Sequence, residues 1–101
     1  MGYEYFASLE TDLDLRLGMP LFTAVEDHFD LVTLSKSSTE LRLQTPENAA
    51  SDWEAVRLAI APRQIYLLFS GGLYREDQEA IQQFVARWLG NRGVPCPWKE
   101  E

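Results

Sequence analysis

This chain of 101 residues has little of the chemistry on which most enzyme active sites depend. It contains one histidine, His28, and one cysteine, Cys96. A single cysteine excludes an intrachain disulfide and fits a reducing cytoplasm better than a secreted setting. A catalytic His28 would need Cys96 or a serine beside it, and no Gly-x-Ser-x-Gly motif is present. We therefore expect no enzyme activity and place His28 at the surface or at a helix end.

Long hydrophobic runs are also missing. The longest uninterrupted apolar stretch, residues 65–69, is far shorter than the roughly 20 residues that span a bilayer. The N-terminus shows no basic segment followed by an apolar run, so we expect no signal peptide. These absences predict a soluble, cytoplasmic protein that does not enter membranes.

Repeats and low-complexity tracts are absent too, and the composition argues against disorder. The hydrophobic fraction is 46% and the aromatic fraction is 12%, which is enough for a packed core. A chain of this length is typical of one domain. We predict a single globular domain over residues 1–101.

Motifs for metals and cofactors are incomplete. Asp12-x-Asp14 and Glu26-Asp27-His28-x-Asp30 supply carboxylate oxygens, but the spacing of a calcium-binding loop is missing. Ser70-Gly71-Gly72 resembles a phosphate-binding turn, yet neither glycine-rich nucleotide fingerprint is present. Acidic residues soon after this turn would also repel an anion. We expect no metal and no cofactor, and we interpret Ser70–Gly72 as a tight turn.

Alternating hydrophobicity predicts several strands. The alternation is clear in residues 3–9, 31–36, 39–45 and 53–60, whereas residues 65–70 are apolar on both faces, as in an interior strand. Segments 31–36 and 39–45 form one expected hairpin, and the two later segments form another. Segment 11–17 fits a strand or a short helix equally well, and segment 46–52 is a polar connection with room for one helical turn.

Two segments carry the spacing of helices. Gly18 breaks the preceding pattern, and apolar residues at intervals of three and four then predict a helix over residues 20–29. Residues 74–89 form the clearest helix, with Ile81, Val85 and Leu89 on one stripe and Gly90 as its end. The order of elements predicts an α+β two-layer sandwich, with a mostly antiparallel sheet of about five strands and two helices on one face.

The three tryptophans have different expected environments. Trp88 belongs to the helical stripe and should lie in the core, and Trp53 should be half-buried at the start of a strand. Trp98 lies in a proline-flanked tail, where it either packs back on the domain or contacts a partner. We favour packing against the domain.

Acidic residues are concentrated in the first half of the chain. Residues 1–54 contain eleven acidic and three basic residues, a balance of −8, whereas residues 55–101 have a balance of +1, giving −7 in total. A surface on which the fold gathers these acidic residues attracts basic partners and repels phosphate backbones, so nucleic-acid binding is disfavoured. The predicted partner-binding residues are Asp12, Asp14, Glu26, Asp27 and Asp30.

Size, acidity and the lack of motifs resemble, at the level of a class, bacterial immunity proteins that neutralise basic toxins. The main hypothesis is therefore a non-enzymatic protein-binding module that docks a basic protein partner. One alternative is a self-associating accessory domain, a homodimer formed through an exposed sheet face or edge. A third is a small enzyme or metabolite-binding domain that uses Tyr3, Tyr5 and Arg57 on the sheet.

Overall fold

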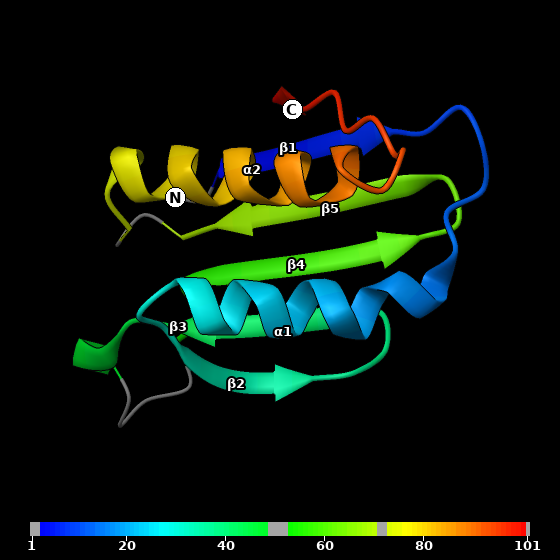
Figure 1. Cartoon of the computed structure of the whole chain (residues 1–101). Coiled ribbons are helices and arrows are strands. Elements are labelled where there is room, and N and C mark those ends of the chain that lie inside the picture. Colours follow the sequence, from blue (N-terminus) through cyan, green and yellow to red (C-terminus); the bar gives the residue numbers. More distant parts are fainter. Residues whose placement is uncertain (1–2, 49–52, 71–72, 101) are drawn as a thin grey trace.

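The computed structural model describes residues 3–48, 53–70 and 73–100. Within these residues the fold has six strands and two α-helices, with two short 3-10 helices, η1 and η2, in the connections (Figure 1). Their bounds are β1 Tyr3–Ser8, η1 Leu15–Leu17, α1 Gly18–His28, β2 Val32–Lys36, β3 Glu40–Gln44, η2 Pro46–Asn48, β4 Val56–Ala61, β5 Gln64–Phe69, α2 Arg75–Gly90 and β6 Lys99–Glu100.

The strands form one sheet in the order β2-β3-β4-β5-β1-β6, with every neighbouring pair antiparallel. Both predicted hairpins are present, β2–β3 and β4–β5. The strand that is apolar on both faces, β5, lies between β4 and β1 as predicted. The sixth strand, β6, has two residues and pairs with β1. It was not predicted, because the two prolines of the tail obscure any strand pattern there.

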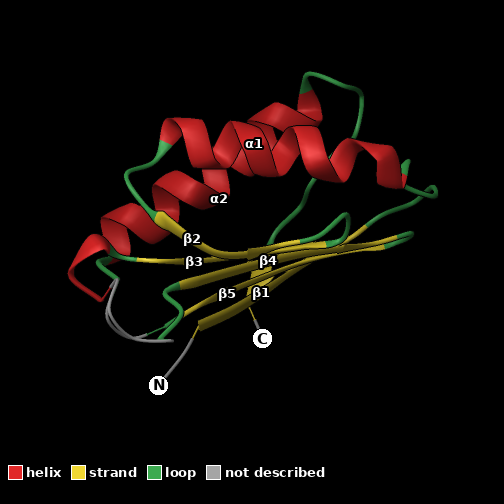
Figure 2. Ribbon diagram, turned by 90° about the horizontal axis from the view of Figure 1, so that it is seen from below, coloured by secondary structure: helices red, strands yellow, loops and turns green. Residues whose placement is uncertain are grey.

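Both helices cover the same face of the sheet (Figure 2). Figure 1 shows α1 over the β2–β4 half and α2 over the β5–β1 half. The core lies between the two layers and includes Phe22, Leu58, Leu67, Phe69 and Val85, all of them at most 1% exposed. The α+β fold with two helices on one face, predicted from the periodicities, is confirmed. The other face of the sheet, here called the open face, has no helix over it.

The start of α1 differs from the prediction. Segment 15–17 is a 3-10 helix, whose first turn is capped by Asp14 Oδ1 accepting a hydrogen bond from the Arg16 amide at 3.0 Å. Helix α1 then begins at Gly18 rather than at residue 20. Gly18 is buried and packs directly against the backbone of the β2–β3 turn, where a Cβ atom would collide with the Ser38 carbonyl oxygen. The glycine is therefore a contact point between elements and not a helix breaker.

The C-terminal tail folds back on α2, as expected. Trp98 Nε1 donates to the Gln82 carbonyl oxygen at 3.0 Å, and the indole packs against the core. Trp88 lies only partly in the core, because its ring also supports Arg92, whose guanidinium carbon is 3.5 Å from the ring centroid. The expectation for Trp53 is wrong: its side chain is 61% exposed, since β4 begins at Val56 and not at the tryptophan.

Two further observations concern a buried polar residue of β3 and the length of the helices. Gln44, expected to face outward from β3, is buried at 3% exposure, at the end of its strand next to the chain connection into η2. Within the described residues, neither helix has the length and hydrophobicity needed to cross a bilayer. The Gly71-Gly72 part of the predicted tight turn falls outside the described residues.

Candidate functional site

The five predicted partner-binding carboxylates do not form one surface. Asp12 and Asp14 lie in the connection before α1, and Asp27 and Asp30 lie at and beyond its other end. An 11-residue helix is about 16 Å long, so these two groups are separated by the length of α1. The neighbours in sequence are therefore not neighbours in space, because a helix and its flanking loops carry them to opposite ends of the fold.

Basic side chains neutralise three of the five locally. Asp12 Oδ1 accepts from Arg63 Nε at 2.8 Å, and Asp14 Oδ2 accepts from Arg16 Nη2 at 2.9 Å. The hydrogen bonds from Arg16 lower the pKa of Asp14 below its ordinary value. These exposed pairs reduce the negative potential at that end of the molecule.

Glu26, the third of these carboxylates, is engaged with strand β2. It accepts from Lys36 Nζ at 2.5 Å and from Thr33 Oγ1 at 2.5 Å. Burial alone would raise the pKa of Glu26, but the hydrogen bonds from Lys36 and Thr33 outweigh it and lower that pKa. Glu26 thus attaches α1 to the edge strand, which is a structural role.

Two predicted residues remain, Asp27 and Asp30, and a groove of about 570 Å³ is lined in part by Asp30 but not by Asp27. It is formed by the α1–β2 connection, the β3–η2 connection and the start of α2, three segments that are distant in the sequence. Its described lining residues include three acids and no base. The lining is Phe29, Asp30, Leu31, Thr45, Pro46, Glu47, Leu73, Tyr74, Asp77 and Ile81.

We call this feature the acidic groove. Asp30, Glu47 and Asp77 supply its charge, and none of them forms an ion pair with another described residue. Tyr74, which is 80% exposed, lies at its side. Apolar lining combined with carboxylates suits a long basic side chain, which places its methylene stem on apolar surface and its charge among oxygens.

Packing between the helices fixes two walls of the acidic groove. His28 stacks on Phe84 of α2 with ring centroids 4.5 Å apart, and Phe29 meets Phe84 edge-on at 5.5 Å. His28 is thus an exposed helix-end residue, as expected. At the start of α2, buried Gln78 donates from Nε2 to the carbonyl oxygen of the lining residue Leu73 at 3.0 Å and holds the chain entering the helix.

The open face is the second candidate surface. Cross-strand register places Glu4, Leu68, Arg57 and Arg42 in one row, and Lys99, Phe6, Tyr66, Ala59 and Glu40 in the next. Phe6 and Tyr66 form an aromatic pair with centroids 5.2 Å apart, and both are only partly buried. The face therefore combines half-exposed apolar side chains with charges at both lateral ends.

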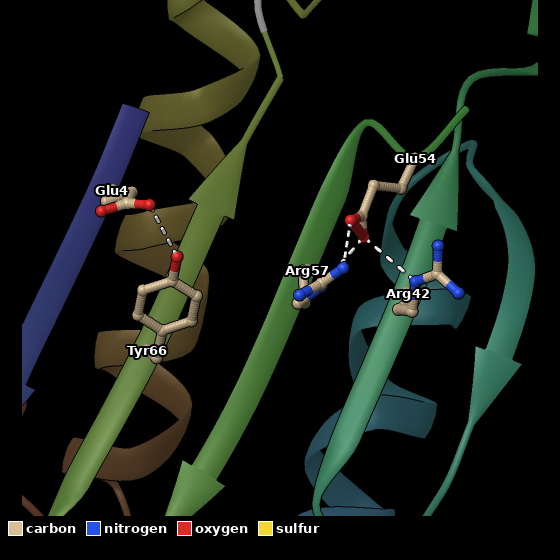
Figure 3. A network of polar contacts seen from close by, with 5 residues as sticks. All are labelled: Glu4, Arg42, Glu54, Arg57 and Tyr66. Carbon is tan, nitrogen blue, oxygen red and sulfur yellow. Dashed lines mark hydrogen bonds and ion pairs between the residues drawn. The ribbon is translucent and has the colours of Figure 1, made fainter. Parts of the chain in front are cut away.

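A carboxylate between two arginines orders part of this face (Figure 3). Glu54 accepts from Arg57 Nη2 at 2.5 Å and from Arg42 Nε at 3.1 Å, and Glu4 accepts from the Tyr66 hydroxyl at 3.1 Å. Burial alone would raise the pKa of Glu54, but the hydrogen bonds from Arg57 and Arg42 outweigh it and lower that pKa. The same contact with Glu54 raises the pKa of Arg57.

The expected metabolite site of Tyr3, Tyr5 and Arg57 is not assembled. The two tyrosines face the helical layer, where they line a small pocket with Arg75 and Gln78, whereas Arg57 lies on the open face. The reason is the register: Tyr5 pairs with inward-facing Leu67, and Arg57 pairs with outward-facing Leu68. That grouping was wrong because it joined residues from opposite faces of the sheet.

Other reactive groups offer little chemistry. Burial raises the pKa of the Cys96 thiol to about 12, so it is poorly suited to act as a thiolate nucleophile at neutral pH. Across residues 3–48, 53–70 and 73–100, no three His, Cys, Asp or Glu side chains converge closely enough to hold a metal ion.

The sequence patterns did not reveal Glu47 and Asp77 as site residues. Glu47 belongs to segment 46–52, which was expected to be a polar connection, and Asp77 is one of the acidic residues that follow Ser70–Gly72 and lies in the first turn of α2. No spacing in the chain links them to Asp30. The one local signal at this end of α2 is the aromatic Tyr74, which is exposed just before the helix begins.

Comparison with known proteins finds no relatives. No protein-family model matches the sequence, and neither a curated protein nor a solved structure is significantly similar to it. The geometry of the acidic groove and of the open face is therefore the basis for inferring function.

Proposed function

We propose that this chain is a non-enzymatic protein-binding module that docks a basic protein at the acidic groove. The observation that carries the proposal is the convergence of Asp30, Glu47 and Asp77 on one apolar-lined groove. In the immunity-type version of this function, the partner is a bacterial toxin with a basic surface. A cytoplasmic location, expected from the single cysteine, is part of the same proposal.

The chemistry of the groove selects a lysine or arginine side chain of the partner. Its aliphatic stem packs on Phe29, Leu31 and Tyr74, and its cationic head is placed among the three carboxylates. Charge-assisted hydrogen bonds to ionised carboxylates are about twice as strong as neutral ones. The groove thus offers both contact area and directional polar bonds to the same residue.

The overall charge supports encounter with such a partner. A net charge of −7 attracts a basic protein from a distance and raises its association rate. Asp12, Asp14, Glu26 and Asp27 contribute to this steering field. Asp12 and Asp14 lie at the other end of α1, Glu26 is bonded to β2, and Asp27 is not among the residues that line the groove. Of the five predicted residues, Asp30 alone belongs to the proposed docking site.

A defined basic peptide tests the proposal. We expect acetyl-Leu-Lys-Leu-Lys-Leu-amide, titrated into ¹⁵N-labelled protein, to shift the backbone amide signals of Phe29, Leu31, Tyr74 and Asp77. The same peptide with glutamate in place of lysine should cause no shift. Binding should weaken as ionic strength rises, because the attraction is screened.

Matched triple variants locate the site. D30N/E47Q/D77N should weaken peptide binding at least about tenfold, because it removes all three groove carboxylates. E10Q/D12N/D14N changes the net charge by the same amount at the other end of α1 and should weaken binding much less. Equal losses in the two variants would show that attraction is merely global and would contradict a docking site in the groove.

A further inference from the structure

The open face differs in charge from the rest of this acidic molecule. Among the residues that the structure describes, three acids, Glu4, Glu40 and Glu54, are balanced there by three bases, Arg42, Arg57 and Lys99. The face is therefore neutral although the whole chain carries −7. Repulsion between two copies of this chain is weakest when they approach through this face.

We propose that the open face packs against the open face of a second copy of this chain, forming a symmetric dimer. The two-fold axis runs parallel to the strands, midway between β4 and β5. That line is the centre of the six-stranded order β2-β3-β4-β5-β1-β6, so each strand of one sheet faces a strand of the other. This interface is separate from the acidic groove and does not depend on the proposed function.

The axis determines which strands face each other. Strand β4 of one copy faces β5 of the other, β3 faces β1, and β2 faces β6. Because the axis is parallel to the strands, each cross-strand row of one copy faces the same row of the other. In the first row, Glu4 of one copy is then opposite Arg42 of the other, and symmetry repeats the pair. Opposite charges thus meet without any change in the strand register of either sheet.

The second row is complementary in shape. Tyr66 of one copy faces Ala59 of the other, so a large ring is placed over a small residue on the adjacent strand. Phe6 of one copy lies over β3 of the other, next to its Glu40. Lys99 of the first copy lies beside the same carboxylate. In the first row, Leu68 covers the aliphatic part of Arg57, whose guanidinium is already bonded to Glu54.

The size of the face is sufficient for a modest dimer. The six strands have lengths of 6, 5, 5, 6, 6 and 2 residues, and at about 3.4 Å per residue and about 4.8 Å between strands they cover roughly 500 Å² per copy. The total of about 1,000 Å² is at the lower limit of specific protein interfaces. Two sheets of this kind pack about 10 Å apart with their strands nearly aligned.

Edge-to-edge pairing of two copies is less suitable. The edge strand β2 has an irregular register between Thr33 and Ser35, which interrupts the row of backbone groups that a second strand would need. The other edge, β6, has two residues. The observations therefore favour the face over the edges.

A charge exchange tests the assigned contact. By sedimentation equilibrium of the full chain, the wild type should be a reversible dimer. Glu4→Arg and Arg42→Glu should each raise the dimer dissociation constant at least about tenfold, because each replaces two attractive contacts with two repulsive ones. The double variant E4R/R42E should restore the dimer, since the opposite charges meet again in exchanged positions.

Controls make every outcome informative. R75E/E79R exchanges the pair on α2 and should leave the dimer unchanged. If a charge variant fails to fold by circular dichroism, Ala59→Arg, which fills the space facing Tyr66, should abolish the dimer. A wild type that is monomeric up to millimolar concentration would overturn the proposal. A dimer that persists in the single charge variants or in Ala59→Arg, or one that E4R/R42E fails to restore, would also overturn it.

Discussion

At the scale of single residues, the carboxylates of this protein have three different roles. Glu26 and Glu54 are partly buried and connect elements, whereas Asp12 and Asp14 form exposed pairs with nearby arginines. Asp30 lines the groove. Identical chemistry thus has different consequences, because burial and local partners decide whether a carboxylate stabilises the fold or stays available to a ligand.

Glu54 makes stability dependent on pH. Its folded-state pKa is below the unfolded value of about 4.3, so its stabilising contribution is present above that pH and is lost as pH falls through the folded pKa. Glu54→Gln should lower the free energy of unfolding at pH 7 by about 1–3 kcal/mol, because it weakens charged hydrogen bonds to two arginines. Urea denaturation at pH 7 and at pH 3 measures the difference.

The cost of Glu54→Gln should shrink at pH 3, because this pH is below the unfolded-state pKa of glutamate and protonation then favours the unfolded chain of the wild type. Glu10→Gln, at an exposed position, should change the free energy of unfolding by no more than about 0.5 kcal/mol at either pH. An equal cost for Glu54→Gln at both pH values would contradict an electrostatic role for this residue.

At the scale of elements, periodicity predicts the members of the fold better than their ends. The stripe of α2 and the alternation of Leu41 and Leu43 in β3 and of Val56, Leu58 and Ile60 in β4 correctly predicted which side chains face the helical layer, whereas β5, apolar on both faces, gave no such direction. The start of α1 was misplaced, because Gly18 was interpreted through its helix propensity alone. Its true role depends on the β2–β3 turn, which is about 20 residues away in the chain.

Gly18→Ala should therefore destabilise the protein despite the better helix propensity of alanine. Its Cβ would meet the Ser38 carbonyl oxygen and would approach Ile60 Cδ1 to 2.7 Å. We expect a loss of about 1–3 kcal/mol in the free energy of unfolding, measured by urea denaturation.

Gly90→Ala is the matched control. It lies at the end of α2, and a Cβ added there would have no contacting atom of the described residues within 4 Å. It should leave the protein unchanged or stabilise it by up to about 1 kcal/mol. If Gly18→Ala and Gly90→Ala had the same effect, close packing at Gly18 would not be the reason for that glycine.

At the scale of the whole molecule, two surfaces with different chemistry are kept apart. The acidic groove lies among the segments that join the helices to the sheet, and the open face lies on the sheet side without helices (Figure 2). A dimer through the open face leaves the groove of each copy accessible. The two proposals can therefore succeed or fail separately.

Variants of one surface should leave the other unaffected. Glu4→Arg should bind the basic peptide with wild-type affinity in the amide-shift titration, and D30N/E47Q/D77N should sediment with the wild-type dimer constant. Separate sites without shared contacts are expected to act additively. Loss of both properties in either variant would indicate that one surface, or the fold as a whole, supports both.

The sequence by itself determined the inward faces of β3, β4 and both helices, because side-chain periods of two and about 3.6 are local properties of the backbone. It also determined the net acidity and the lack of a catalytic motif. Only the tertiary structure decided which charges meet. Asp30, Glu47 and Asp77 come from three separate segments, and Glu4 shares a row with Arg57 and Arg42 through strand order and register, which no local pattern encodes.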